Sequence, residues 1–200
     1  DNNFLGTGNR FILGINKSIY QESYNVSFFD PYFTMDGVSR GYSLYFRETD
    51  YGEFNVANYL TNSQGAGVQF GYPISDTQRI GLNLNFDNTD IDAGSLPSRE
   101  ISDFLASEGT IFDVLKAQAV WSRITLNRGM FPTYGSSTDV MLQATIPGSD
   151  LTYFKTNIRQ KFYRPIGFAN LVFGFNGELG YIDTYGDTKK TPFFENFYST

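Results

Sequence analysis

The sequence contains no cysteine and no histidine among its 200 residues. Without these side chains a protein cannot build a Ser-His-Asp triad, a Cys-His pair, a disulfide bond or nearly any zinc site. Nor does the chain contain an apolar run near the roughly 18 residues that a transmembrane helix needs. These absences exclude the commonest hydrolases, thiol redox chemistry and helical membrane proteins.

Basic residues are outnumbered, with 15 Lys and Arg against 21 Asp and Glu, which gives a net charge of −6. Because the basic residues do not cluster, nucleic acid is not expected as a partner. Aromatic residues are abundant, with 20 Phe, 14 Tyr and 1 Trp, yet the mean hydropathy is only −0.30. Large apolar groups therefore coexist with many uncharged polar ones, and this mixture requires an architecture with two different faces.

Strict alternation of apolar and polar residues is the dominant pattern, as in residues 80–87, where Ile, Leu, Leu and Phe alternate with Gly, Asn, Asn and Asp. A strand points successive side chains to opposite faces, so each such segment has one apolar face. The pattern predicts nine strands, at 9–18, 20–30, 38–51, 65–74, 79–90, 114–127, 137–147, 151–164 and 168–183. Helical spacing of Ile101, Phe104 and Leu105 predicts one helix over 98–108, which we expect to cap the end of the sheet.

The expected connections differ between the two ends of the strands. Compact links at 31–37, 75–78, 128–136 and 165–167 alternate with a set that includes the longer 52–64 and 91–113. This arrangement is typical of an all-β, antiparallel up-and-down transmembrane β-barrel, whose short turns face the periplasm. A soluble β-sandwich also alternates, but the Gly-, Asn-, Gln- and Ser-rich polar faces favour a water-filled lumen. Single-chain bacterial barrels have an even number of strands, so nine strands suggest part of a larger barrel, or else a complete one of eight or ten strands.

Five stretches in a fixed order, at 4–9, 30–39, 128–133, 146–150 and 192–198, resemble the barrel domain of the BamA family, the central barrels of the outer-membrane β-barrel assembly machinery. Each stretch alone is a weak signal, but together they extend over nearly the whole chain. The motif residues are Asp30, Pro31, Tyr32, Phe33, Gly37, Gly129, Phe131, Pro132, Pro147, Gly148, Pro192, Phe194, Glu195, Asn196, Phe197 and Tyr198.

The resemblance implies a barrel of sixteen strands, of which residues 1–200 would hold about nine, preceded by periplasmic POTRA repeats that bind accessory lipoproteins. It also implies a non-covalent insertase that assembles β-barrel proteins in the bacterial outer membrane, with membrane lipid and unfolded barrel clients as partners. By that resemblance the POTRA repeats, the remaining strands, the lateral seam and the lid motif lie outside this chain. The alternative within the same superfamily is a passive pore or secretion channel; a soluble lectin-like sandwich and a barrel enzyme are weaker alternatives.

Several charged groups are candidates for chemistry. The carboxylates Asp87, Asp90 and Asp92, and Glu48, Asp50 and Glu53, could serve a glycosidase or bind Ca²⁺, but they lack the required spacing and are expected to be solvated charges. The cations Arg40, Arg47, Lys155, Arg159 and Lys161 could line a lumen and attract anions, or could pair with acids such as Glu178. Trp121 shares a face with Ala117 and Ala119 and is expected to face lipid. No residue has a catalytic pattern, so no enzyme activity, cofactor or metal is expected.

A sheet of nine strands that does not close leaves two edges without partners, and unpaired backbone groups are costly in lipid. We therefore expect residues 1–200 expressed alone not to form a stable monomeric barrel. A monodisperse monomer in detergent whose migration changes on heating would contradict this expectation.

Overall fold

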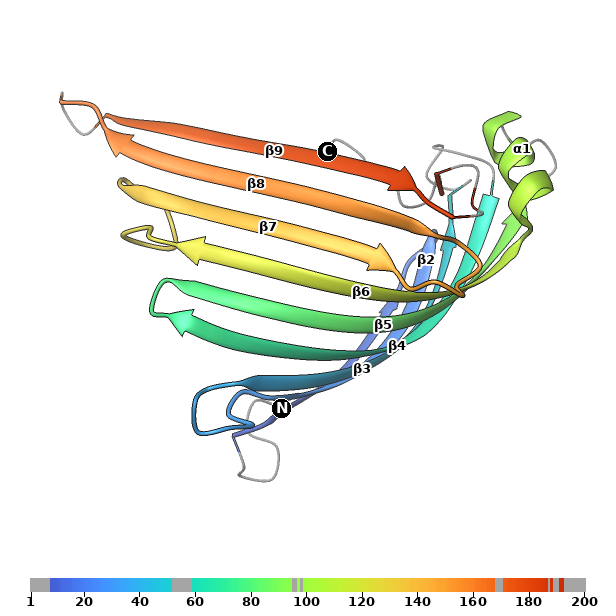
Figure 1. Ribbon diagram of the computed structural model, residues 1–200, viewed down its shortest axis with the longest axis horizontal. Coiled ribbons are helices and arrows are strands. Elements are labelled where there is room, and N and C mark those ends of the chain that lie inside the picture. Colours follow the sequence, from blue (N-terminus) through green and yellow to red (C-terminus); the bar gives the residue numbers. More distant parts are fainter. Residues whose placement is uncertain are drawn as a thin grey trace.

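A computed structural model describes residues 8–51, 59–94, 97, 99–167, 171–186, 188 and 191–192 (Figure 1). These residues form nine strands and one helix. The elements are β1 (Arg10–Lys17), β2 (Gln21–Asp30), β3 (Ser39–Asp50), β4 (Tyr59–Ser75), β5 (Gln78–Ala93), α1 (Arg99–Glu108), β6 (Ile111–Ile124), β7 (Gly135–Thr145), β8 (Tyr153–Pro165) and β9 (Val172–Thr184).

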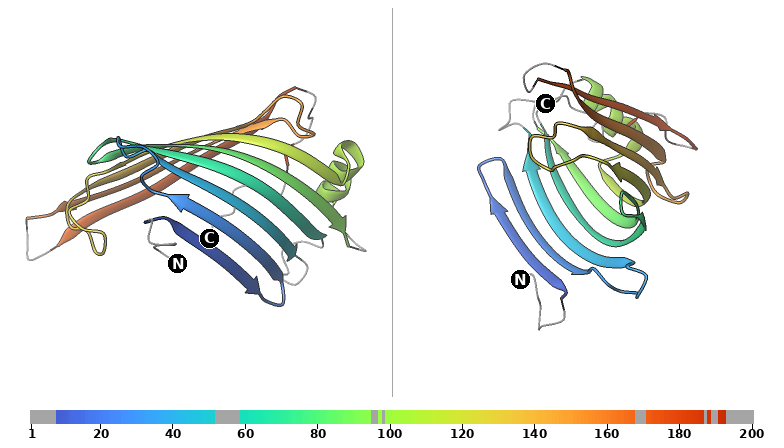
Figure 2. Two further views of the ribbon diagram at one scale, coloured as in Figure 1. Left: turned by 90° about the horizontal axis from the view of Figure 1, so that it is seen from below. Right: turned by 90° about the vertical axis from the view of Figure 1, so that its left-hand side faces the viewer.

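All nine strands belong to one antiparallel sheet in which each strand pairs with its neighbours in the sequence, from β1 at one edge to β9 at the other. The sheet is curved like a section of a barrel wall, and α1 lies at one end of the strands (Figures 1 and 2). The predicted meander of nine strands with one helix is therefore confirmed. Within the described part of the chain, the longest helix is too short to cross a membrane.

Most strand boundaries differ from the sequence prediction by one to four residues, and the start of β4 differs by six. β4 begins at Tyr59 rather than at residue 65, because residues 59–64 pair with β5 although both of their faces are largely polar. β6 ends at Ile124 rather than at residue 127, because Asn127 belongs to the turn that follows. The Asn127 side chain there accepts hydrogen bonds from the backbone N–H groups of Thr133 and Tyr134.

The register of the sheet places the alternating residues on two distinct faces. Leu82, for example, lies beside Phe70 on β4 and Ala119 on β6, whereas Asn83 lies beside Gln69 and Gln118. Across the sheet the first set forms an apolar face. The second set forms a polar face rich in Gly, Asn, Gln and Ser.

Among the described residues, one buried apolar core lies at the α1 end of the polar face. It contains Tyr59, Ile91, Ile101, Phe104, Phe112, Val114, Leu151 and Tyr153. Helix α1 supplies Ile101 and Phe104, and the ring of Phe104 packs 5.8 Å from that of Phe112 on β6. The helix predicted from this spacing therefore covers the ends of the central strands, as expected.

Candidate functional surfaces

The apolar face carries a continuous band of exposed large side chains. On β5 it consists of Ile80, Leu82, Leu84 and Phe86, of which Leu82 and Leu84 are 55% and 51% exposed. Exposing this much apolar surface to water is energetically unfavourable, and an apolar patch of this extent normally contacts another apolar phase. The band therefore identifies this face as a contact surface for lipid or protein.

The band is not equally wide across the sheet. On β5 its flanking polar residues, Gln78 and Asn88, are ten residues apart, but on β3 the flanking Arg40 and Glu48 are only eight apart. At roughly 3.4 Å of rise per residue, these intervals correspond to about 34 Å and about 27 Å of strand. β1 and β2 resemble β3, because each has three outward apolar residues between polar ones: Phe11, Leu13, Ile15, Tyr24, Val26 and Phe28.

Ion pairs and hydrogen bonds mark both borders of the narrow part of the band. At the α1 end, Lys17 Nζ lies 2.9 Å from Glu22 Oε2 across the β1–β2 turn. At the opposite end, Arg40 lies 3.5 Å from Asp30 and its Cζ stands 3.9 Å from the centre of the Phe33 ring. These charged groups border the apolar residues of the strands themselves, and exposed apolar side chains continue in the adjoining turns at Ile19, Tyr32 and Met35.

At the α1 end, the wide part of the band is bordered by uncharged polar and acidic side chains. Gln64 Nε2 donates to Asn88 Oδ1 at 3.2 Å, and Asn88 Nδ2 donates to Asp113 Oδ1 at 2.7 Å. These three residues lie side by side on β4, β5 and β6. A ladder of side-chain hydrogen bonds therefore replaces the ion pairs found at the border on β1–β3.

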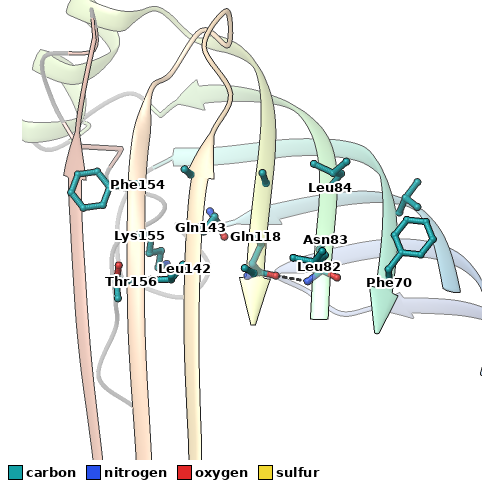
Figure 3. A pocket seen from close by; sticks show the side chains of 14 residues that line it. Phe70, Leu82, Asn83, Leu84, Gln118, Leu142, Gln143, Phe154, Lys155 and Thr156 are labelled. Carbon is teal, nitrogen blue, oxygen red and sulfur yellow. Dashed lines mark hydrogen bonds between the residues drawn. The ribbon is translucent and has the colours of Figure 1, made fainter. Parts of the chain in front are cut away.

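A shallow depression of about 540 Å³ interrupts the band over β4–β8 (Figure 3). It forms where the small side chains of Ala117, Ala119 and Ala144 lie between larger neighbours such as Leu142 and Phe154. Trp121 lies on the same face, as the sequence predicted, and its Nε1 donates to Gln78 Oε1 at 3.3 Å.

The polar face is rich in positive charge although the chain is acidic overall. By register, its strand positions carry seven cations and three acids: Arg10, Arg47, Arg79, Lys116, Lys155, Arg159 and Lys161 against Asp87, Asp139 and Glu178. Four of the five predicted lumen cations therefore lie on this face. Arg40 does not, because it shares a face with Tyr42 and pairs with Asp30. Arg159 pairs with Glu178 through contacts of 3.0 to 3.2 Å.

The polar face also contains a recess of about 370 Å³ next to the buried core. On its floor the Tyr45 hydroxyl donates to Asp87 Oδ1 at 2.5 Å, and Lys116 Nζ lies 3.2 Å from Asp87 Oδ2. The pair can form only because residue 65, between β3 and β5, is glycine. A Cβ there would lie 2.6 Å from Asp87 Oδ1 and 2.7 Å from the Tyr45 ring.

The carboxylate clusters suggested by the sequence do not assemble into a site. Asp87 lies on the polar face, whereas the register puts Asp90 and Asp92 on the opposite face. Glu48 and Asp50 belong to β3, and Glu53 lies outside the described residues. Across the described ranges no group of three or more acidic residues is placed to hold a metal ion.

The motif residues fall mainly in connections between strands. Asp30 ends β2, and Pro31, Tyr32, Phe33 and Gly37 form the turn to β3, where Gly37 has φ +81°. Gly129, Phe131 and Pro132 lie in the β6–β7 turn, and Pro147 and Gly148 lie between β7 and β8. Phe131 has φ +50°, which is uncommon for a residue with a side chain. Pro192 is buried, and Phe194, Glu195, Asn196, Phe197 and Tyr198 lie outside the described residues.

Sequence reasoning missed the recess and the change in band width. The small residues Gly65-Ala66-Gly67 could have signalled a place where side chains from neighbouring strands meet, but only the register shows that Tyr45 and Asp87 flank Gly65. The spacing of Arg40 and Glu48 was visible in the sequence. This spacing gives the width of the apolar band only once it is known that Arg40 and Glu48 both lie on the apolar face.

Comparison with known proteins places this sheet among outer-membrane barrels. A family model for the Omp85 superfamily domain matches residues 3–200. The outer membrane protein assembly factor BamA of Neisseria meningitidis serogroup B is 30% identical over 206 residues, which cover 98% of this chain and 26% of that protein. The crystal structure of BamA from Haemophilus ducreyi lacking POTRA domains 1–3 superposes with a TM-score of 0.86 at 24% identity, over 98% of this chain and 39% of that one. The chain thus spans about a quarter of the length of its curated relative.

Proposed function

This chain belongs to the Omp85 superfamily of outer-membrane proteins, and on that premise we propose that it forms part of the barrel of an assembly factor that inserts β-barrel proteins into the bacterial outer membrane. The apolar face then contacts lipid and the polar face lines the lumen. The reaction is non-covalent and needs no enzyme chemistry, since the free energy comes from folding of the client.

The observation that carries this proposal is the narrow apolar band on β1–β3. Strands of outer-membrane barrels tilt by about 35–45° from the membrane normal, and their apolar bands are about 25 Å tall. With such a tilt the interval between Arg40 and Glu48 corresponds to roughly 21 Å of bilayer, against roughly 26 Å for Gln78 to Asn88. A bilayer thins locally to match a short apolar surface.

Local thinning provides a mechanism for insertion. A client strand that enters next to β1–β3 must carry its polar backbone and lumen-facing side chains across less hydrocarbon than elsewhere. Unsatisfied backbone groups cost several kcal/mol each in the bilayer core, so a thinner core lowers the barrier. A barrel that served only as a passive pore would not need an apolar band that is narrower on β1–β3 than on its other strands.

The test uses the parent chain that contains this segment, reconstituted in liposomes. An unfolded barrel client is added, and its folding is timed by the change in its electrophoretic migration on heating. We expect clear acceleration over empty liposomes and over liposomes that contain a passive porin. Folding no faster than with the porin would reject the insertase proposal and favour the passive pore or secretion channel.

A substitution at the border of the band connects the activity to the mechanism. Glu48→Leu extends the apolar surface of β3 by one outward position, so we expect slower client folding. Glu48→Gln is the matched control, because it removes the charge but keeps the border polar, and it should retain most of the rate. Equal rates for both variants and the parent protein would argue against thinning at β3 as the cause.

The remaining parts of the machine are also proposals. We infer that the parent chain supplies the other strands of a sixteen-stranded barrel, together with periplasmic POTRA repeats that bind accessory lipoproteins. Support comes from the family match and from the name of the Haemophilus ducreyi structure, which refers to POTRA domains. Pull-down of lipoproteins by the parent chain, with and without the segment preceding the barrel, tests this inference.

A further inference from the structure

The recess on the lumen-facing side has the composition of a binding site. It lies beside the buried core beneath α1 and draws its lining from five neighbouring strands, β2 to β6. Hydroxyl groups dominate its walls, from Thr49, Thr61, Ser63 and Thr89. Thr49 and Thr61 are only 6% and 7% exposed, so the recess penetrates the packed part of the protein rather than resting on its surface.

The charges inside the recess do not cancel. Asp87 is the acid at its floor, and both of its carboxylate oxygens are occupied, one by the Tyr45 hydroxyl and the other by Lys116. Arg47 is the second cation in the lining, and its Cζ stands 5.8 Å from the centre of the Tyr45 ring. Among the described residues no carboxylate lies within ion-pair distance of Arg47. Counted over the described residues of its lining, the recess therefore carries one positive charge in excess.

We propose that this recess binds an oxyanion, a carboxylate or a phosphate, through the guanidinium of Arg47 and the neighbouring hydroxyls. Guanidinium groups bind oxyanions with two parallel hydrogen bonds, and threonine and serine hydroxyls can donate further ones. A bound cation would be repelled by Arg47 and Lys116 together. The surplus of seven cations over three acids on the lumen-facing positions draws anions toward the recess from the rest of the lumen.

This inference does not depend on the insertase proposal, because it concerns only the wall of the lumen. The carboxylate could come from an acidic side chain of a polypeptide within the lumen, and the phosphate from a free ion or a lipid headgroup. Both sources share the chemistry that Arg47 recognises. Separate titrations with sodium acetate and with inorganic phosphate distinguish them.

The experiment is isothermal titration of the detergent-solubilised parent chain with each probe at constant ionic strength. We expect at least one probe to bind, and Arg47→Gln to weaken that binding about tenfold, since a hydrogen-bonded charge partner is lost. The affinity of Arg47→Lys should lie between those of the parent chain and of Arg47→Gln, because lysine keeps the positive charge but lacks the planar guanidinium group. Lys161→Gln is the matched control: it removes a cation from the same face outside the recess lining and should change the affinity less than twofold.

Two results would overturn the proposal. One is the absence of binding by either probe up to about 50 mM, far above the concentrations at which a built site retains its ligand. The other is equal weakening by Arg47→Gln and Lys161→Gln, which would mean that the lumen attracts anions only through its overall charge. Arg47 is solvent-exposed on one side, so its replacement should not prevent folding, and heat-dependent migration of each variant confirms this before titration.

Discussion

Two groups of strands in the sheet, β1–β3 and β4–β6, use the same alternating pattern but differ in how they are stabilised. On β4–β6 the apolar band is wide, and the α1 ends of the strands pack into a core with Tyr59, Phe104 and Phe112. On β1–β3 the band is narrow, and its borders are formed by the ion pairs of Lys17 with Glu22 and Arg40 with Asp30. One side is held by protein packing, whereas the other depends on the surrounding lipid.

Under the proposed function, this difference explains how a barrel wall can be stable and yet accommodate a neighbouring client. Local opening is easiest where few apolar contacts are buried and hydrogen bonds lie near solvent. Among the described residues, β1–β3 contribute none to the buried core, whereas β4–β6 are held in place by it. We expect the amide hydrogens of β1–β3 to exchange faster than those of β4–β6.

The largest effect should follow from loss of the core beneath α1. Phe104 is 2% exposed, so Phe104→Ala should lower the free energy of unfolding by about 3–5 kcal/mol, since it leaves a cavity. Phe46→Ala on β3 is the control, because lipid chains can fill the space and the loss should be smaller. Hydrogen exchange of the parent chain should show the change in β4–β6. Equal losses for both variants would remove the distinction between the two sides.

A charge placed on the lipid-facing surface should report the local thickness of the bilayer. Leu84→Arg lies in the wide band on β5 and should cost about 2–4 kcal/mol, the range for arginine near the bilayer midplane. Leu44→Arg lies in the narrow band on β3, closer to both headgroup layers, and should cost clearly less. Both are measured by denaturant unfolding in liposomes. A higher cost at Leu44 than at Leu84 would contradict a thinner bilayer at β3.

An intermediate loss of stability is expected from a substitution on β4, the strand that joins β1–β3 to the rest of the sheet. Gly65→Ala would bring a Cβ to 2.6 Å from the backbone oxygen of Phe86, so the strands must move apart, at a cost of about 1–3 kcal/mol. Gly81→Ala on β5 is the matched control, because its nearest neighbours would lie 3.9 Å away. That variant should be neutral or slightly stabilising, since alanine loses less backbone entropy. Thermal unfolding in detergent compares the two.

Much of this architecture could be predicted from the sequence because its physical cause is local. Alternation on β5 and the spacing of Ile101, Phe104 and Leu105 depend on neighbours in the chain, and they gave the strands and the helix. The early start of β4 could not be predicted, because residues 61–64 are polar on both faces and become part of a strand only by pairing with β3 and β5.

The functional surfaces depended on register, which alternation alone does not determine. Arg40 and Arg47 were both predicted as lumen cations, but the two are an odd number of residues apart and point to opposite faces. The same limit applied to Tyr45 and Asp87, which are 42 positions apart in the sequence and meet across Gly65. The motif residues Asp30, Phe131 and Pro147 stay predictions as functional residues, since their positions at the end of β2 and in connections do not assign them a role.

The smallest effect is expected at the border of the narrow band. Arg40→Gln removes a partly exposed ion pair with Asp30 and the stacking on Phe33, and should lower the free energy of unfolding by about 1 kcal/mol. Arg40→Lys keeps the charge but cannot stack as a planar group, so it should recover only part of the loss. Raising the salt concentration should weaken the ion pair but leave the stacking. Full recovery by lysine, with strong salt dependence, would show that charge alone sets this border, and the packing of Arg40 on Phe33 would then have no part in fixing the width of the band.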